Sequence, residues 1–131
     1  MSSSGSIRNL RVWQEGMKLA RELYRDTASF PKHELYGLTQ QIRRAAVSVP
    51  SNIAEGKGHH SDKESAHFLF NARGSLLELE TQLMLAEELE YLSAAEGRRL
   101  LAFAECVGRA LSGLINSLRG FRRDDAAWGR L

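Results

Sequence analysis

Residues 41–58, QIRRAAVSVPSNIAEGKG, decide the fold of this chain. Apolar residues recur every three or four positions just before and within this stretch, which places them on one face of an α-helix. They are Leu35, Leu38, Ile42, Ala45, Val49 and Ile53. Pro50 lies inside the same helix, where it removes a backbone donor at a cost of about 3 kcal/mol. Such a helix is normally bent and held by its neighbours. We therefore predict a packed helix that starts between Lys32 and Leu35 and ends near Gly56.

A polar stripe runs beside that apolar face, again at steps of three and four. Its members are Gln41, Arg44, Ser48, Asn52 and Glu55. Buried polar side chains are usually satisfied inside the protein. We interpret this polar seam as a small network between helices or between subunits, and a ligand or RNA pocket is the functional alternative.

Three further segments have helical periodicity. The first spans about 10–29, with Asn9 as its cap. The other two open with capping boxes, Ser61–Glu64 and Ser93–Glu96, and end near Tyr91 and at Gly120. Their predicted core positions are Ser65, Phe68, Leu69, Ala72, Leu76, Leu79, Leu83 and Ala86 in one, and Leu100, Ala104, Val107, Leu111, Leu114 and Leu118 in the other.

Four long amphipathic helices with short connections favour antiparallel neighbours. We predict an all-α fold, an antiparallel up-down-up-down four-helix bundle. The 131 residues suffice for one domain. The bundle is expected to span 9–120, between a flexible N-terminal tail at 1–8 and a C-terminal tail at 121–131.

Composition places the chain among soluble globular proteins, with 43% hydrophobic and 26% charged residues. A net charge of +2 is too small by itself to indicate a nucleic-acid partner. No apolar run approaches the roughly 18 residues of a membrane span, and the first residues do not form a secretory signal. The single Cys106 fits a reducing compartment. We predict a cytoplasmic protein with no membrane partner.

The residues that could carry chemistry give no catalytic pattern. Cys106 stands between the predicted core positions Ala104 and Val107, so we interpret it as an inert packing residue. No serine lies on a nucleophile elbow. We predict no enzymatic activity and no cofactor.

The loop before the third helix is rich in potential metal ligands: His59, His60, Asp62, Glu64 and His67. With Ser61 as the helix cap, His59 and His60 belong to the loop, and the HExxH pattern of zinc enzymes is absent. We predict no metal site, and a metal-binding or small-ligand-binding bundle is the less favoured alternative.

Some apolar residues fall outside the predicted core faces. They are Phe70, Leu77 and Met84 on the third helix and Leu101 and Ile115 on the fourth. Apolar stripes on the outside of a bundle commonly mark a contact surface. We predict that these five residues form a homo-oligomer interface, and a wider core is the alternative.

Basic residues form small clusters that are candidates for binding phosphate groups. They are Arg43, Arg44, Lys57, Arg98, Arg99, Arg119, Arg122 and Arg123. Repetition around an oligomer axis would make a weak patch multivalent, and its binding would depend on salt. Aromatic residues are not interleaved with these clusters in the sequence, so only a mode based on shape and charge is expected.

Three segments carry a family resemblance: VWQEGMKLA (12–20), RRAAVSVPSNIAEGKG (43–58) and FLFNARGSLLELETQL (68–83). Together they resemble the bacterial four-helix-bundle proteins, also called the 23S ribosomal RNA intervening-sequence protein family, over about residues 7–120. The resemblance implies ring-shaped pentamers and an association with RNA. Similar bundles act as accessory proteins of diversity-generating retroelements, where they bind nucleic acid and a reverse transcriptase. This chain is less basic than those proteins.

These observations predict a non-enzymatic, homo-oligomeric binding or scaffold protein, a pentamer by resemblance. Its expected partner is RNA or DNA, in particular structured RNA or a nucleoprotein, with a reverse transcriptase as a further partner if one is encoded beside it. The alternative is a protein-binding adaptor with no nucleic-acid role.

Overall fold

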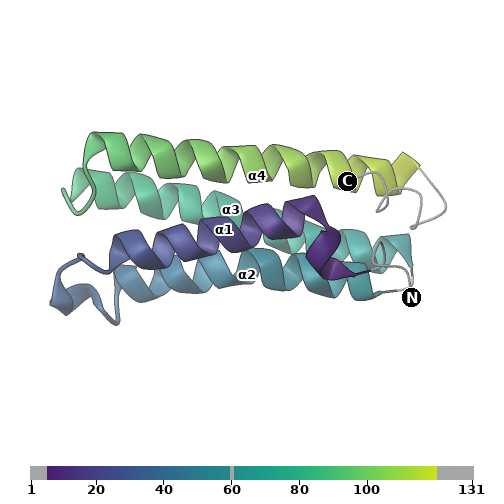
Figure 1. Ribbon diagram of the computed structural model, residues 1–131, viewed down its shortest axis with the longest axis horizontal. Helices are drawn as coiled ribbons and strands as arrows, with labels where there is room; N and C mark the ends of the chain where they lie inside the picture. Colours follow the sequence, from purple (N-terminus) through teal and green to yellow (C-terminus); the bar gives the residue numbers. More distant parts are fainter. Residues whose placement is uncertain (1–5, 60, 121–131) are drawn as a thin grey trace.

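The computed structural model of the protein describes residues 6–59 and 61–120, with the backbone alone at 119 and 120. Its elements are η2 (Ile7–Asn9), α1 (Arg11–Thr27), η3 (Lys32–Glu34), α2 (Leu38–Gly58), α3 (Asp62–Glu88) and α4 (Ala94–Gly120). These described residues contain no strand. The four long helices alternate in direction, so the α1–α2 and α3–α4 connections share one end of the bundle (Figure 1). The predicted all-α, antiparallel four-helix bundle is confirmed.

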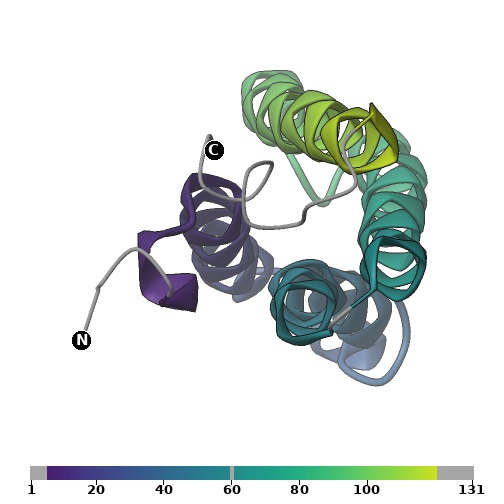
Figure 2. The same cartoon turned by 90° about the vertical axis from the view of Figure 1, so that its right-hand side faces the viewer.

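The helices follow one another around the bundle in chain order (Figure 2). Their apolar faces meet inside it. All predicted core positions of α3 and α4 are buried except Phe68, which is half-buried. Ile115 is also buried, with 1% of its surface exposed. The prediction that it lies on an outer face is therefore wrong, because Leu114 and Ile115 both face inward on an α4 core face wider than one seam.

The predicted capping box of α4 is complete, and that of α3 has only its serine half. In α4 the exchange is reciprocal: the Ser93 hydroxyl accepts from the Glu96 amide at 3.1 Å, and the Glu96 carboxylate accepts from the Ser93 amide at 3.0 Å. In α3 the Ser61 hydroxyl accepts from the Glu64 amide at 3.1 Å, and it donates to the Glu64 carboxylate. These contacts satisfy backbone donors that a helix start would otherwise leave unpaired.

The starts of α1 and α2 differ from the predictions. Leu10 precedes α1 without a side-chain cap and Asn9 ends η2, so the Asn9 cap is wrong. α2 starts at Leu38, after the predicted region, because Glu34 folds back and its carboxylate accepts from the Leu38 amide at 3.0 Å. Leu35 thus lies outside α2 and is 48% exposed. Helix α3 ends at Glu88, slightly before the end predicted near Tyr91.

Pro50 is buried inside α2, where α1 packs closely. A Cβ atom at Gly16 of α1 would stand 3.4 Å from a Val49 methyl and 3.7 Å from the Pro50 Cβ. The absence of a side chain at Gly16 lets the two helices approach. As predicted, the helix continues through the proline and is supported by a neighbouring helix.

Candidate nucleic-acid interface

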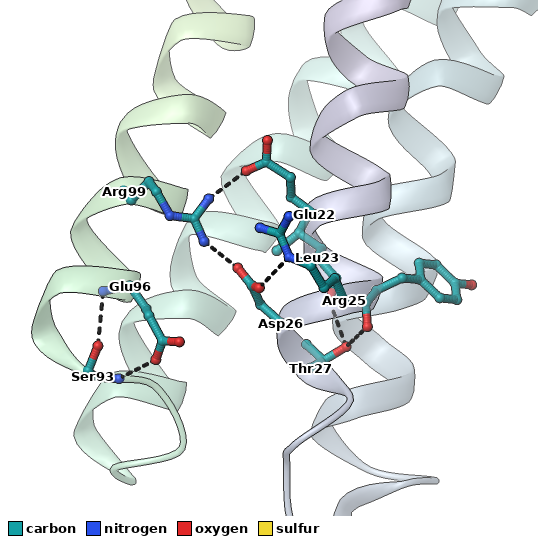
Figure 3. Close-up of polar contacts among 9 residues, drawn as sticks. Glu22, Leu23, Arg25, Asp26, Thr27, Ser93, Glu96 and Arg99 are labelled. Carbon is teal, nitrogen blue, oxygen red and sulfur yellow. Dashed lines mark hydrogen bonds and ion pairs between the residues drawn. The ribbon is translucent and has the colours of Figure 1, made fainter.

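Arg99 is partly exposed, and its guanidinium is engaged by two carboxylates of α1. It donates to the carboxylates of Glu22 and Asp26, and these contacts join α4 to α1 (Figure 3). The two acidic side chains are 16% and 10% exposed. Arg99 therefore contributes to bundle closure, and its prediction as a phosphate ligand is not supported by this geometry.

The electrostatics of that contact favour the ionised acid. Burial raises the pKa of the Asp26 carboxyl, but hydrogen bonds from Arg25 and Arg99, together with their charges, outweigh it. The pKa of Asp26 is consequently lowered from its ordinary value of 3.8. The pair stays charged at neutral pH.

Arg43 is held in place by the end of α1. Its Nε donates to the Thr27 hydroxyl at 3.0 Å and its Nη2 donates to the Tyr24 carbonyl at 3.1 Å. Its guanidinium carbon also lies 4.7 Å from the centre of the Tyr24 ring. Arg43 is half-buried and thus has a fixed position beside an aromatic ring.

Arg44 and Arg98 are exposed, and neither guanidinium forms a hydrogen bond or ion pair with another residue in the described ranges. Lys57 lies near the other end of α2, about 20 Å from Arg44 for a rise of about 1.5 Å per residue. Arg122 and Arg123, and the side chain of Arg119, lie outside the described residues. The predicted basic residues that the structure describes therefore do not form one continuous patch.

Arg43 and Arg44 share a hollow on the outside of α1, α2 and their connection. We call it the arginine–tyrosine hollow, and its lining residues are Tyr24, Leu35, Tyr36, Gln40, Arg43, Arg44, Val47 and Ser48. None of these eight side chains is acidic. Tyr36 is 85% exposed and Tyr24 is 44% exposed. The prediction that aromatics are absent from the basic clusters is thus wrong, because the fold supplies two rings from outside the arginine segment.

An apolar groove continues from this hollow along α1 and α2. Its lining residues are Trp13, Met17, Ala20, Arg21, Tyr24, Val47, Pro50, Ser51 and Ala54. Tyr24 and Val47 line both depressions. The groove adds a third aromatic residue and a third arginine to the same face, again without an acidic lining residue.

The predicted polar seam divides into two parts. Asn52 donates to the Ser48 carbonyl and hydroxyl at 2.9 Å each, and the Ser48 hydroxyl lies 2.8 Å from the Ser75 hydroxyl on α3. Ser75 in turn donates to the Asn71 carbonyl at 3.1 Å. This part is the predicted network between helices, although the sequence did not reveal Ser75 as a partner.

The other seam members do not join that network. Gln41, Arg44 and Glu55 are exposed, and the Glu55 carboxylate lies 3.8 Å from His59 Nε2. These three residues therefore lie outside the network between helices, and a network between subunits stays a prediction.

The outer face of α3 and α4 holds most of the predicted oligomer residues. Leu77 and Met84 are 59% and 48% exposed. Phe70 is half-buried against the core, with the Arg73 guanidinium 4.9 Å from its ring centre, and Leu101 is half-buried. Ile115 lies in the core. Of the five predicted interface residues, Leu77 and Met84 are therefore best placed to contact another copy of the chain.

A second hollow lies on this face between α3 and α4. Its charged lining residues are Arg73, Glu80, Glu105 and Arg109. Burial, and secondarily the neighbouring Glu105 charge, raise the pKa of Glu80 above its ordinary 4.5. The sequence did not indicate that these two carboxylates line one hollow, because they stand on different helices.

His59, in the connection between α2 and α3, contacts an aromatic ring of α3. The His59 ring stacks on the Phe68 ring with centres 4.7 Å apart. Among residues 6–59 and 61–120, no three His, Cys, Asp or Glu side chains are placed to hold a metal ion. His60 lies outside the described residues.

Cys106 is exposed, so its interpretation as a core packing residue is wrong. Ala104 and Val107 both point into the core. On a helix of 3.6 residues per turn, the Cys106 side chain points about 100° or more away from each of them. The helices of the described part include none long and apolar enough for a bilayer.

Comparison with known proteins gives a family and a fold. The model of the family described as "23S rRNA-intervening sequence protein" matches residues 8–113. A crystal structure from Bacteroides thetaiotaomicron, of a protein with unknown function from the S23 ribosomal protein family, is similar with a TM-score of 0.72 and 20% identity. The match covers 79% of this chain and 97% of that one. No curated protein matches the chain.

Proposed function

Because the chain belongs to the 23S rRNA-intervening sequence protein family, we propose that it is a non-enzymatic, homo-oligomeric scaffold that binds structured RNA. The RNA contact is assigned to the arginine–tyrosine hollow. The outer face of α3 and α4 is assigned to contact between copies.

One observation carries the RNA assignment: two arginines line a hollow that has no acidic lining residue. Arg43 is preset by Thr27 and Tyr24, and Arg44 has no competing partner in the described part of the chain. Uncompensated guanidinium groups favour phosphate, which they bind through several donors at once. A modest overall charge is compatible with this local preference.

The oligomer assignment is supported by exposed Leu77 and Met84, seven residues apart on α3. Burial of such side chains against another copy would remove apolar surface from water. By family resemblance the assembly is a pentameric ring. A ring repeats the hollow around its axis, so that one RNA engages several weak sites and gains avidity.

The alternative function is a protein-binding adaptor, which the apolar groove favours. Its lining is largely apolar, with Trp13, Met17 and Val47 among the contributors, and tryptophan and tyrosine are common at protein contacts. In the retroelement relationship implied by resemblance, a reverse transcriptase encoded nearby would be the protein partner.

Fluorescence anisotropy of a labelled RNA hairpin, titrated at several salt concentrations, tests the RNA assignment. We expect binding that weakens as salt rises. Arg44→Glu should weaken it further and reduce the slope of log K against log salt by about one for each phosphate that is no longer neutralised. Arg44 is the cleaner probe because Arg43 also anchors α2 to α1.

Arg98→Glu is the matched control, since Arg98 is exposed on α4 and lies outside the hollow. The same charge change there should have a much smaller effect. Equal losses of affinity for the two variants would indicate a general charge effect and remove the hollow from the proposal. No binding by the unmodified protein at low salt would leave the adaptor.

A further inference from the structure

Tyr36 is more exposed than any other large hydrophobic residue in the described ranges, at 85%. It sits in the connection between η3 and α2, at the edge of the arginine–tyrosine hollow. The phenol contributes little to the bundle core in that position. A large ring left in water beside two arginines is a surface available for a ligand.

The segment that carries Tyr36 is ordered by its neighbours on both sides. The Glu34 carboxylate accepts from the Leu38 amide at 3.0 Å and from the Tyr91 hydroxyl at 2.8 Å. The Gly37 amide donates to the Glu34 carbonyl at 2.9 Å. Tyr91 also packs on Phe30, with ring centres 5.3 Å apart. Tyr36 is thus presented from a fixed turn, which lowers the entropy cost of using its ring.

Gly37 leaves room for that arrangement. A Cβ atom at this position would stand 2.6 Å from the Glu34 carboxylate oxygen. Any side chain here would displace the acid that links α2 to Tyr91. The exposed ring and the glycine after it therefore belong to one local structure.

Aromatic and cationic groups occur together on this face of the bundle. Tyr36, Arg44, Arg43 and Tyr24 line the hollow, and Arg21 and Trp13 continue along the groove. Rings that stack on bases, combined with cations that follow the phosphates, are the features of single-strand binding surfaces. Paired bases are stacked within their own duplex and do not offer their faces.

We infer that the arginine–tyrosine hollow binds unpaired nucleotides, such as those of a hairpin loop, with one base stacked on Tyr36 and the adjoining phosphates on Arg43 and Arg44. This inference rests on the proposed RNA association and specifies its substrate class. The RNA is read by base faces and phosphates, so sequence preference is weak. A duplex of equal charge binds less well.

The test compares a single-stranded oligoadenylate RNA with a blunt RNA duplex of half its length, which has about the same number of phosphates. Binding of both is measured by fluorescence anisotropy on the full chain. Tyr36→Ala should raise the Kd for the single strand about tenfold, equivalent to about 1.4 kcal/mol. It should leave the Kd for the duplex unchanged. Tyr36→Phe, which keeps the ring, should bind the single strand like the unmodified protein.

Leu35→Ala is the matched control, because Leu35 lines the same hollow and is exposed without offering a ring. Its Kd should change less than that of Tyr36→Ala. A second readout is photo-cross-linking of an oligonucleotide that contains 4-thiouridine, with the attachment site mapped by mass spectrometry. Attachment at Tyr36 or Tyr24 supports stacking in the hollow.

The outcomes separate the inference from the function on which it rests. If the protein binds RNA but Tyr36→Ala binds the single strand as tightly as before, base stacking is wrong and the RNA association stands. If no RNA binds, the proposed function fails first. If Tyr36→Ala changes the assembly mass instead, this face contacts another copy of the chain and the inference is overturned.

Discussion

The two outer faces of this bundle have similar hollows and different charges. On the α1–α2 face, the arginine–tyrosine hollow has Arg43 and Arg44 and no acidic lining residue. On the α3–α4 face, Arg73 and Arg109 are matched by Glu80 and Glu105. The first face also exposes Tyr36, whereas the second exposes Leu77 and Met84.

This difference shows why counting basic residues is a poor guide to a binding face. An arginine with an acidic neighbour already has a counter-charge. It therefore gains little binding free energy from a phosphate. Uncompensated arginines beside aromatic rings suit a polyanion with stackable bases. We call the α3–α4 face the balanced face, because its arginines are matched by glutamates. Its exposed aliphatic side chains suit contact with another protein surface.

The largest effect is expected from a charge placed on the balanced face. Leu77→Asp should dissociate the proposed oligomer, because burying an unpaired carboxylate in an apolar contact costs more than the contact gains. Light scattering after size exclusion should show a lower mass, and circular dichroism should show unchanged helicity.

Asn71→Asp is the control for that variant, since Asn71 is exposed on α3 but points about 120° away from Leu77. It should keep the assembly. An unchanged mass for Leu77→Asp would assign copy-to-copy contact to the α1–α2 face and reverse the comparison.

A smaller effect is expected where the two faces join, at the contact of α4 with α1. Arg99→Met removes the donors to Glu22 and Asp26. We expect the free energy of unfolding to fall by about 1 kcal/mol, a value reduced for solvent screening because the Arg99 side chain is 45% exposed. Urea denaturation measures the loss, and Arg98→Met should change stability less.

The same contact predicts a pH dependence. Because the folded-state pKa of Asp26 is lowered, its contribution is complete above the ordinary value of 3.8 and is lost as pH falls through the lowered value. Arg99→Met should lose less stability than the unmodified protein over that acidic range. Parallel pH profiles for the two proteins would contradict this account.

The smallest effect is expected from the carboxylates of the balanced face. The raised pKa of Glu80 means that its contribution is more favourable at low pH and is lost as pH rises through the raised value. Glu80→Gln should therefore increase stability at pH 7 by about 0.5 kcal/mol, with allowance for exposure. Glu88→Gln, an exposed site on the same helix, is the control in thermal denaturation, and an equal gain there would exclude a specific repulsion.

Local sequence patterns predicted the fold well, because helix periodicity and capping depend on residues a few positions apart. The seam from Leu100 to Leu118 and the serine caps at Ser61 and Ser93 are examples. The start of α2 was predicted less well, because Glu34 forms a cap from outside the helix.

The candidate site was only partly predictable. Arg43 and Arg44 were selected from sequence, but the rings that complete their hollow come from Tyr24 on α1 and Tyr36 in the connection. Likewise, Ser75 joins Ser48 across 27 positions of the chain. Such neighbours are set by packing between helices, and a single sequence with no repeated motif gives no signal for them.

The bond between Arg99 and the two α1 acids also bears on how the molecule opens. α1 packs less extensively on α4 than on α2. The ion pairs of Arg99 stabilise part of the α1–α4 boundary. Local separation of secondary elements begins where apolar contact is least, and salt weakens partly exposed ion pairs. Amide hydrogens that face the α1–α4 boundary should therefore exchange with deuterium before those between α2 and α3, and high salt should widen the difference.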